Sequence, residues 1–256
     1  MAGKASRAEP GTFEQSWRDR FERFGAAHDD DAGIAGWSQS GLATRFRRFQ
    51  SLFTGSVAGQ TWLDAGCGAG TYARFLAARG GDVLAVDYSL PTLFKARARS
   101  PGPIEWATAD VTALPLRSGC VNGALCFGVM QALSAPGPAL DELARVVRPG
   151  GEVWVDALNA NCLPSLLANA WRWVRRRPRH LRYDSPSRVV ASMQASRFDA
   201  VRCHWVPILP GPLRRLQPIV ETRFVRGLLD AVPLFGSFVS HSFLVVGRVR
   251  LPGADQ

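Results

Sequence analysis

Short apolar runs alternate with amphipathic stretches through most of the chain. Strands are predicted at 61–65, 82–86, 104–108, 122–127, 151–157, 199–207 and 240–248, and helices at 70–79, 89–98, 137–147, 163–177, 186–196 and 218–232. Alternation at this spacing is typical of parallel strands joined by crossover helices. We therefore predict an α/β fold with a doubly wound, mostly parallel seven-stranded sheet.

The segment before the first strand has a different pattern. Aromatic residues at 13, 17, 21 and 24 recur at helical spacing, and a second helix is predicted at 39–53. We predict a helical lid at 1–55, a core at 56–160, and a last part, 161–256, that completes the core and carries a helical insertion between the last two strands. The acidic run 29–31 is predicted to be a solvated turn rather than a metal site, and we predict no metal.

Composition adds a charge asymmetry. The 256 residues are 46% hydrophobic with a net charge of +10, which excludes a disordered or membrane-spanning class. Residues 1–160 are electrically neutral, so the whole excess lies in residues 161–256. The five cysteines contain no C-x-x-C pair, and the N-terminus has no apolar signal segment. We expect a cytoplasmic protein and leave a peripheral membrane contact open.

A glycine-rich loop follows the first predicted strand. Gly66, Gly68 and Gly70 let the backbone approach a ligand closely, and the next helix offers free N–H groups at its start. Thr71 occupies the place of the third glycine in a dinucleotide fingerprint, and Asp64 precedes the loop. Both features disfavour NAD or FAD, because a carboxylate repels pyrophosphate and attracts an amine or sulfonium.

Two further acids follow the next strands. Asp87 ends the second strand, 21 residues after Gly66, where a carboxylate is placed to accept both hydroxyls of a ribose. Asp110 follows the third strand and is expected at the same edge of the sheet. Open α/β sheets bind ligands at this carboxyl edge.

With these residues the chain resembles the class I S-adenosylmethionine-dependent methyltransferases, in particular the small-molecule (type 11-like) core, which has a Rossmann-like sheet. The matching segments are LDAGCGAGTY at 63–72, AVDYS at 85–89, TADVTALPL at 108–116 and LARVVRPGGEVWVDAL at 143–158. The four segments follow one another in the order found in the family. They span about 100 residues, roughly 40% of the chain.

The resemblance implies S-adenosyl-L-methionine as cofactor and S-adenosyl-L-homocysteine as product. It implies that Asp64 and the glycine loop hold the methionine portion, that Asp87 takes the ribose hydroxyls, and that Asp110 meets the adenine amino group. The full set of implied cofactor-binding residues is Asp64, Gly66, Cys67, Gly68, Gly70, Asp87, Tyr88, Asp110, Val111 and Phe127.

A proton acceptor is harder to assign. Many members of the family carry histidine just after the fourth strand, where this chain has Val129 and Gln131 around a methionine. We take His28, next to the acidic run, as the first candidate catalytic residue and Tyr183 as another. The alternatives are a surface histidine and a packing tyrosine.

The basic last third contains two unusual segments. The segment 163–177 is an amphipathic helix with arginines on one face and Trp171 and Trp173 at the borders, an arrangement found at membrane interfaces. We favour the alternative that this helix covers the sheet or the pocket. About 30 extra residues, centred on 212–235, separate the last two strands. We expect their apolar face to cover an acceptor pocket, to contact a second subunit in a homodimer, or to contact lipid.

We predict a methyltransferase acting on an oxygen, nitrogen or carbon nucleophile of a small, largely apolar metabolite, of natural-product or lipid/quinone-like type. The alternatives are a cofactor-binding protein without turnover, an RNA methyltransferase and an NAD-dependent oxidoreductase. The sequence after the fourth strand lacks the Asn/Asp-Pro-Pro-aromatic pattern of base methyltransferases, and no Pro-Cys dipeptide is present. Both observations argue against nucleic acid as the partner.

Overall fold

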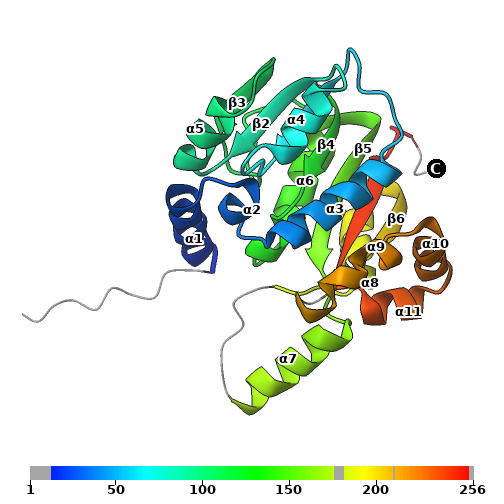
Figure 1. Cartoon of the computed structure of the whole chain (residues 1–256). Coiled ribbons are helices and arrows are strands. Elements are labelled where there is room, and N and C mark those ends of the chain that lie inside the picture. Colours follow the sequence, from blue (N-terminus) through cyan, green and yellow to red (C-terminus); the bar gives the residue numbers. More distant parts are fainter. Residues whose placement is uncertain (1–12, 176–181, 210, 254–256) are drawn as a thin grey trace, which may run out of the picture.

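A single twisted sheet organises the molecule (Figure 1). The computed structural model describes residues 13–175, 182–209 and 211–253. The sheet has seven strands in the order β3-β2-β1-β4-β5-β7-β6. Their bounds are β1 (Thr61–Ala65), β2 (Asp82–Asp87), β3 (Ile104–Thr108), β4 (Val121–Cys126), β5 (Val147–Leu158), β6 (Phe198–Val206) and β7 (Ser242–Val249). Only β7 runs antiparallel to its neighbours, so the predicted fold class is confirmed.

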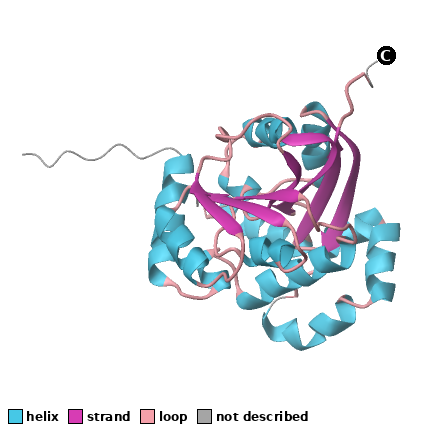
Figure 2. Ribbon diagram, turned by 90° about the horizontal axis from the view of Figure 1, so that it is seen from above, coloured by secondary structure: helices cyan, strands magenta, loops and turns pink. Residues whose placement is uncertain are grey.

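Helices cover both faces of the sheet (Figure 2). On one face, α6 (Gly137–Val146) and α8 (Pro186–Ala195) contribute Leu140, Leu143 and Met193 to an apolar core. On the other face, α4 (Thr71–Ala77), α5 (Leu90–Ala98) and α3 (Gln39–Leu52) share a second apolar core, in which Phe49 of α3 is fully buried. Between these cores the six strands other than β7 end at the same edge of the sheet, where β7 begins.

The N-terminal helices lie over that edge. They are α1 (Phe13–Ala27) and the short α2 (Asp31–Ile34), followed by α3. The acidic run between α1 and α2 is largely exposed, as predicted for a solvated turn, but its carboxylates have specific partners. Asp29 pairs with Lys95, Asp30 caps α2 by accepting the Gly33 N–H, and Asp31 pairs with Arg74 of α4. No group of three or more potential metal ligands is found in the described part of the chain.

The predicted insertion between the last two strands is present, but it is not one helix over 218–232. After a 3-10 segment (Gly211–Leu216), it forms α9 (Gln217–Val220), α10 (Arg223–Ala231) and α11 (Pro233–Val239). The helix breaks because Thr222 accepts the Val225 N–H as a new cap, and Pro233 starts another helix. The helix α7 (Leu163–Val174) projects from the body (Figure 1), so the expectation that it covers the sheet or the pocket is wrong. Residues 176 and 177 of the predicted helix lie outside the described residues. None of the described helices is both long and apolar enough to cross a membrane.

Candidate functional site

The glycine loop joins β1 to α4. Gly66, Gly68 and Gly70 have φ of 74°, 50° and 78°, values that favour glycine. A Cβ at Gly66 would lie 2.3 Å from Cγ2 of Val129, and one at Gly70 would lie 2.6 Å from the ring of Trp106. A Cβ at Gly68 would meet nothing within 4 Å. The loop is therefore packed at both ends and open in the middle, where a ligand has room.

Asp64 lies beneath this loop and is buried. Its carboxylate accepts the Ala73 N–H, and its Oδ2 atom has no hydrogen-bond partner. Burial raises the pKa of Asp64 to about 7. This carboxylate does not itself line the cavity described below.

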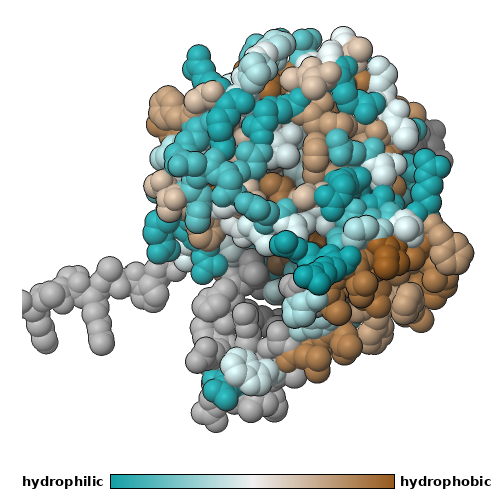
Figure 3. Space-filling view, in the orientation of Figure 1, coloured by the Kyte–Doolittle hydropathy of each residue, from teal (hydrophilic) through white to brown (hydrophobic). Residues whose placement is uncertain are grey.

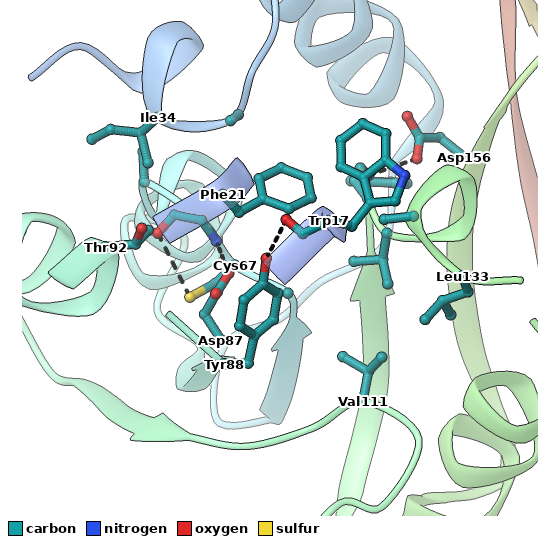
Figure 4. A pocket seen from close by; sticks show the side chains of 18 of the residues that line it. Trp17, Phe21, Ile34, Cys67, Asp87, Tyr88, Thr92, Val111, Leu133 and Asp156 are labelled. Carbon is teal, nitrogen blue, oxygen red and sulfur yellow. Dashed lines mark hydrogen bonds between the residues drawn. The ribbon is translucent and has the colours of Figure 1, made fainter. Parts of the chain in front are cut away.

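Asp87, at the end of β2, connects the loop to the next turn. Its Oδ2 accepts the Gly68 N–H at 2.9 Å and its Oδ1 accepts the Ser89 N–H at 2.9 Å. Burial raises the pKa of Asp87 despite these hydrogen bonds. The next residue, Tyr88, donates its hydroxyl to the Trp17 carbonyl of α1 at 3.3 Å (Figure 4).

Asp110 follows β3 at the same edge. Thr112 donates to it from the backbone at 2.9 Å and from the hydroxyl at 2.6 Å, and Arg18 of α1 forms an ion pair with it. Burial acts to raise the pKa of Asp110, but the Thr112 hydrogen bonds and the Arg18 charge outweigh it and hold the pKa below its ordinary value. The lid is thus attached to the rim at Asp110 and at Tyr88.

A cavity of about 410 Å³ lies between the lid and the carboxyl edge. Of the ten predicted cofactor-binding residues, the structure brings eight to its wall: Gly66, Cys67, Gly68, Asp87, Tyr88, Asp110, Val111 and Phe127. Apolar lid residues, including Trp17, Phe21 and Ile34, form the facing wall (Figure 4). This volume is within the range of pockets for small organic ligands.

A buried ion pair lies at the β5 side of the cavity. Nε of Arg45, on α3, is 3.4 Å from Oδ2 of Asp156, and both side chains are almost fully buried. The guanidinium lies 3.8 Å from the centre of the Trp37 ring. Asp156 also accepts the Gly128 N–H at 2.7 Å. Burial raises the pKa of Asp156 and lowers that of Arg45, while each charge opposes the shift of the other.

The two predicted catalytic residues lie elsewhere. His28 is exposed, with its ring against Phe24, and is not in the cavity wall. Tyr183 is half-buried against His241 and is also outside that wall. None of the histidines in the described ranges lines the cavity. The reason is geometric. The residues of α1 that line the cavity lie within 14–21, whereas His28 follows the end of this helix, where its carbonyl accepts from Lys95 of α5.

Several wall residues were not identified from the sequence. Asp156 stands at the carboxyl end of a strand, as Asp64, Asp87 and Asp110 do, so the same rule predicts its position. Arg45 is a charged residue beside an otherwise apolar helix face, which is a detectable signal. Trp17 and Phe21 give no such signal, because aromatic residues that pack in a core recur at the same helical spacing.

The central part of the chain is similar to known methyltransferases. Residues 63–155 match the family model described as a methyltransferase domain. The chain is 35% identical over 159 residues to malonyl-[acyl-carrier protein] O-methyltransferase of Salmonella typhimurium, covering 61% of this chain and 59% of that protein. It is also 35% identical over 115 residues to demethylmenaquinone methyltransferase of Renibacterium salmoninarum, covering 45% of this chain and 48% of that one. The chain thus spans about half the length of these curated relatives.

Solved structures share the fold. A methyltransferase from a Haloferax volcanii complex with the Trm112 activator superposes with a TM-score of 0.66 at 18% identity, covering 91% of this chain and 97% of that one. Magnesium protoporphyrin IX methyltransferase of Synechocystis, solved with bound S-adenosylhomocysteine, gives 0.59 at 14% identity, covering 93% and 95%. At such identities the likeness establishes the fold alone.

Proposed function

We propose that this protein, whose residues 63–155 form a methyltransferase domain within a class I S-adenosylmethionine-dependent methyltransferase fold, transfers a methyl group to a small, largely apolar acceptor. One observation carries the proposal. The open glycine loop and the carboxylates of Asp87 and Asp110 surround one end of a cavity whose opposite wall is apolar.

The residues at that end fit S-adenosylmethionine. Asp87 offers a carboxylate to ribose hydroxyls, Asp110 and Val111 lie at the rim where an adenine would sit, and Gly68 leaves backbone-lined space. Asp64 lies beneath the loop, outside the cavity wall, and when ionised it would place negative charge near the cationic end of the cofactor. When bound, the cofactor supplies an electrophilic methyl group on sulfur.

The lid positions the reactants and excludes water. Trp17 and Phe21 of α1 and Ile34 of α2 cover the cavity, and the contacts from Arg18 to Asp110 and from Tyr88 to Trp17 fasten them to the rim. Holding nucleophile and methyl group in line in a dry site is the main contribution expected of a methyltransferase scaffold.

We assign the proton acceptor to Asp156 in place of His28 and Tyr183. Asp156 lines the cavity two strands beyond the glycine loop, on the side left for the acceptor. Burial raises the pKa of its carboxyl group, which makes the carboxylate a stronger base. The Arg45 guanidinium opposes this rise and holds the carboxylate in place.

The acceptor class follows from the cavity wall and is consistent with the relatives. The names of two of these relatives specify a malonyl-[acyl-carrier protein] and demethylmenaquinone as acceptors. An acyl or quinone-like molecule would suit the apolar side chains of Trp17, Leu133 and Phe127.

Calorimetry tests the cofactor part of the proposal. We expect S-adenosylhomocysteine to bind the full chain and NAD not to bind. Binding of NAD with no binding of S-adenosylhomocysteine would replace the proposal with an oxidoreductase.

The absence of a described histidine from the cavity wall favours one second candidate, a cofactor-binding protein without turnover. Binding of S-adenosylhomocysteine with no methylated product from any acceptor tried would support that candidate.

A further inference from the structure

Exposed apolar side chains are concentrated in one part of the molecule. Of the 17 large hydrophobic residues exposed in the described chain, 14 lie between residues 163 and 239. Phe224 and Leu234 are 80% and 79% exposed. Figure 3 shows a hydrophobic patch over the corner where Figure 1 places α10 and α11. We call the exposed apolar side chains of residues 213–239 the C-terminal apolar face.

The helices of this face leave large apolar side chains uncovered. In α10, Leu229 packs into the core, and Arg226 and Asp230 pair with Glu221 and Arg48. Phe224 and Leu228 of the same helix face outward.

In α11 the small residues face the protein and the large apolar side chains face outward. Gly236 packs on the ring of Trp205, and the carbonyl of Ser237 accepts from Asn159 at 2.7 Å. Phe235 and Phe238 are about half exposed on the other side. Exposure of a contiguous apolar surface to water is unfavourable, so a surface of this kind marks an interaction site.

The charges of residues 213–239 indicate which kind of partner covers the C-terminal apolar face. Its acids, Glu221 and Asp230, are held by Arg47 and Arg48 of α3. Exposed cations at Arg214, Arg215 and Arg223 form no ion pair with any residue that the structure describes. An apolar face with unpaired cations complements a bilayer that contains anionic lipids. A second copy of the chain would bring the same unpaired cations together.

The helix α7 adds a second contact of the same character. Leu167 and Trp171 are 62% and 51% exposed, and the Arg175 guanidinium lies 4.6 Å from the centre of the Trp171 ring. Aromatic and cationic side chains combined in this way are characteristic of helices at a membrane surface. In Figure 1, α7 and α11 lie on the side toward which β5 points, the edge that also bears the cavity.

We propose that the C-terminal apolar face and α7 dock the protein on the surface of an anionic membrane, with the cavity edge turned toward the lipid. The inference is independent of the methyl-transfer chemistry, since binding to vesicles needs no cofactor. Docking would also place the cavity next to the bilayer, from which an apolar acceptor would enter.

Vesicle flotation of the full chain tests this proposal. We expect binding to vesicles of equimolar phosphatidylcholine and phosphatidylglycerol, and at least tenfold weaker binding to phosphatidylcholine alone or at high salt. The double variant Phe224→Ser with Leu234→Ser should lose most of this binding. The matched control is Leu90→Ser with Phe94→Ser on α5, which are also exposed and should bind like the wild type.

A charge pair of variants tests the electrostatic part. Arg214→Glu with Arg215→Glu should bind anionic vesicles at least tenfold more weakly than Arg97→Glu with Arg117→Glu, which makes the same charge change at exposed positions elsewhere. Thermal unfolding of each variant checks that it folds. The proposal is overturned if wild type does not float, if the α5 control loses as much binding, or if the Phe224 variant only converts a dimer to a monomer.

Discussion

Asp64 is a buried carboxylate whose protonation affects the stability of the fold. Burial raises its pKa to about 7, whereas the unfolded chain has a value of about 3.9. Between these values the folded state holds the extra proton, so its stability falls as the pH rises through this window. Asp64→Asn removes this effect. We expect its free energy of unfolding in urea to increase relative to wild type by up to about 1.4 kcal/mol per pH unit between about pH 4 and 7. A difference that is constant over this range would contradict the burial of an ionisable carboxyl here.

Asp87 provides the most direct residue test of the cofactor site. Asp87→Ala removes the acceptor offered to ribose and the hydrogen bond to the Gly68 N–H. We expect the Kd of S-adenosylhomocysteine in calorimetry to rise at least tenfold. Asp82→Ala, at the exposed start of the same strand, should leave the Kd unchanged. Equal affinity in the two variants would show that the ribose does not bind at the end of β2.

Asp156 tests the assignment of the base. Asp156→Asn should lower kcat for an acceptor that loses a proton by roughly 10²–10⁴-fold. The affinity for S-adenosylhomocysteine should stay near that of wild type, and the acidic limb of the pH–rate profile should disappear. Glu152→Gln, an outer position of β5, is the control. Unchanged kcat in Asp156→Asn would assign proton transfer to water or to another group.

At the scale of elements, the lid is held by its ion pairs. Asp31 accepts from Thr71 and Arg74, both at the start of α4 directly after the glycine loop. Asp31→Asn should therefore loosen α2 and make S-adenosylhomocysteine dissociate several-fold faster in stopped-flow measurements. Asp29→Asn, whose carboxylate is 94% exposed, should have little effect. Equal dissociation rates in the two variants would mean that α2 does not gate the cavity.

The elements that local pattern determines were predictable. Every strand begins and ends within a few residues of its prediction, apart from the longer start of β5, because a buried strand and its turn are encoded locally. The strand-end acids and the glycine loop were predictable from the same local sequence pattern.

What depends on distant packing was not predictable. The partners of the acidic run at 29–31 lie on α4 and α5, and Arg45 meets Asp156 only after the sheet has formed. Periodicity also cannot show where a cap divides one amphipathic stretch into α9, α10 and α11.

At the scale of the whole molecule, the charge and the chemistry are separated. Residues 1–160, which carry the lid and nearly all of the cavity wall, have no net charge. The excess of positive charge belongs to the last part of the chain, with α7 and the C-terminal apolar face. The basic character of the protein therefore concerns where it docks rather than the reaction it performs.

Transfer of label from S-[methyl-³H]adenosylmethionine into a bacterial lipid extract tests the central claim most directly. The wild type is predicted to place label in the organic phase, and Asp87→Ala to place at least tenfold less there under the same conditions. Label confined to RNA or to the aqueous phase, or organic-phase label equal in the two proteins, would contradict methyl transfer to a small apolar acceptor at this site.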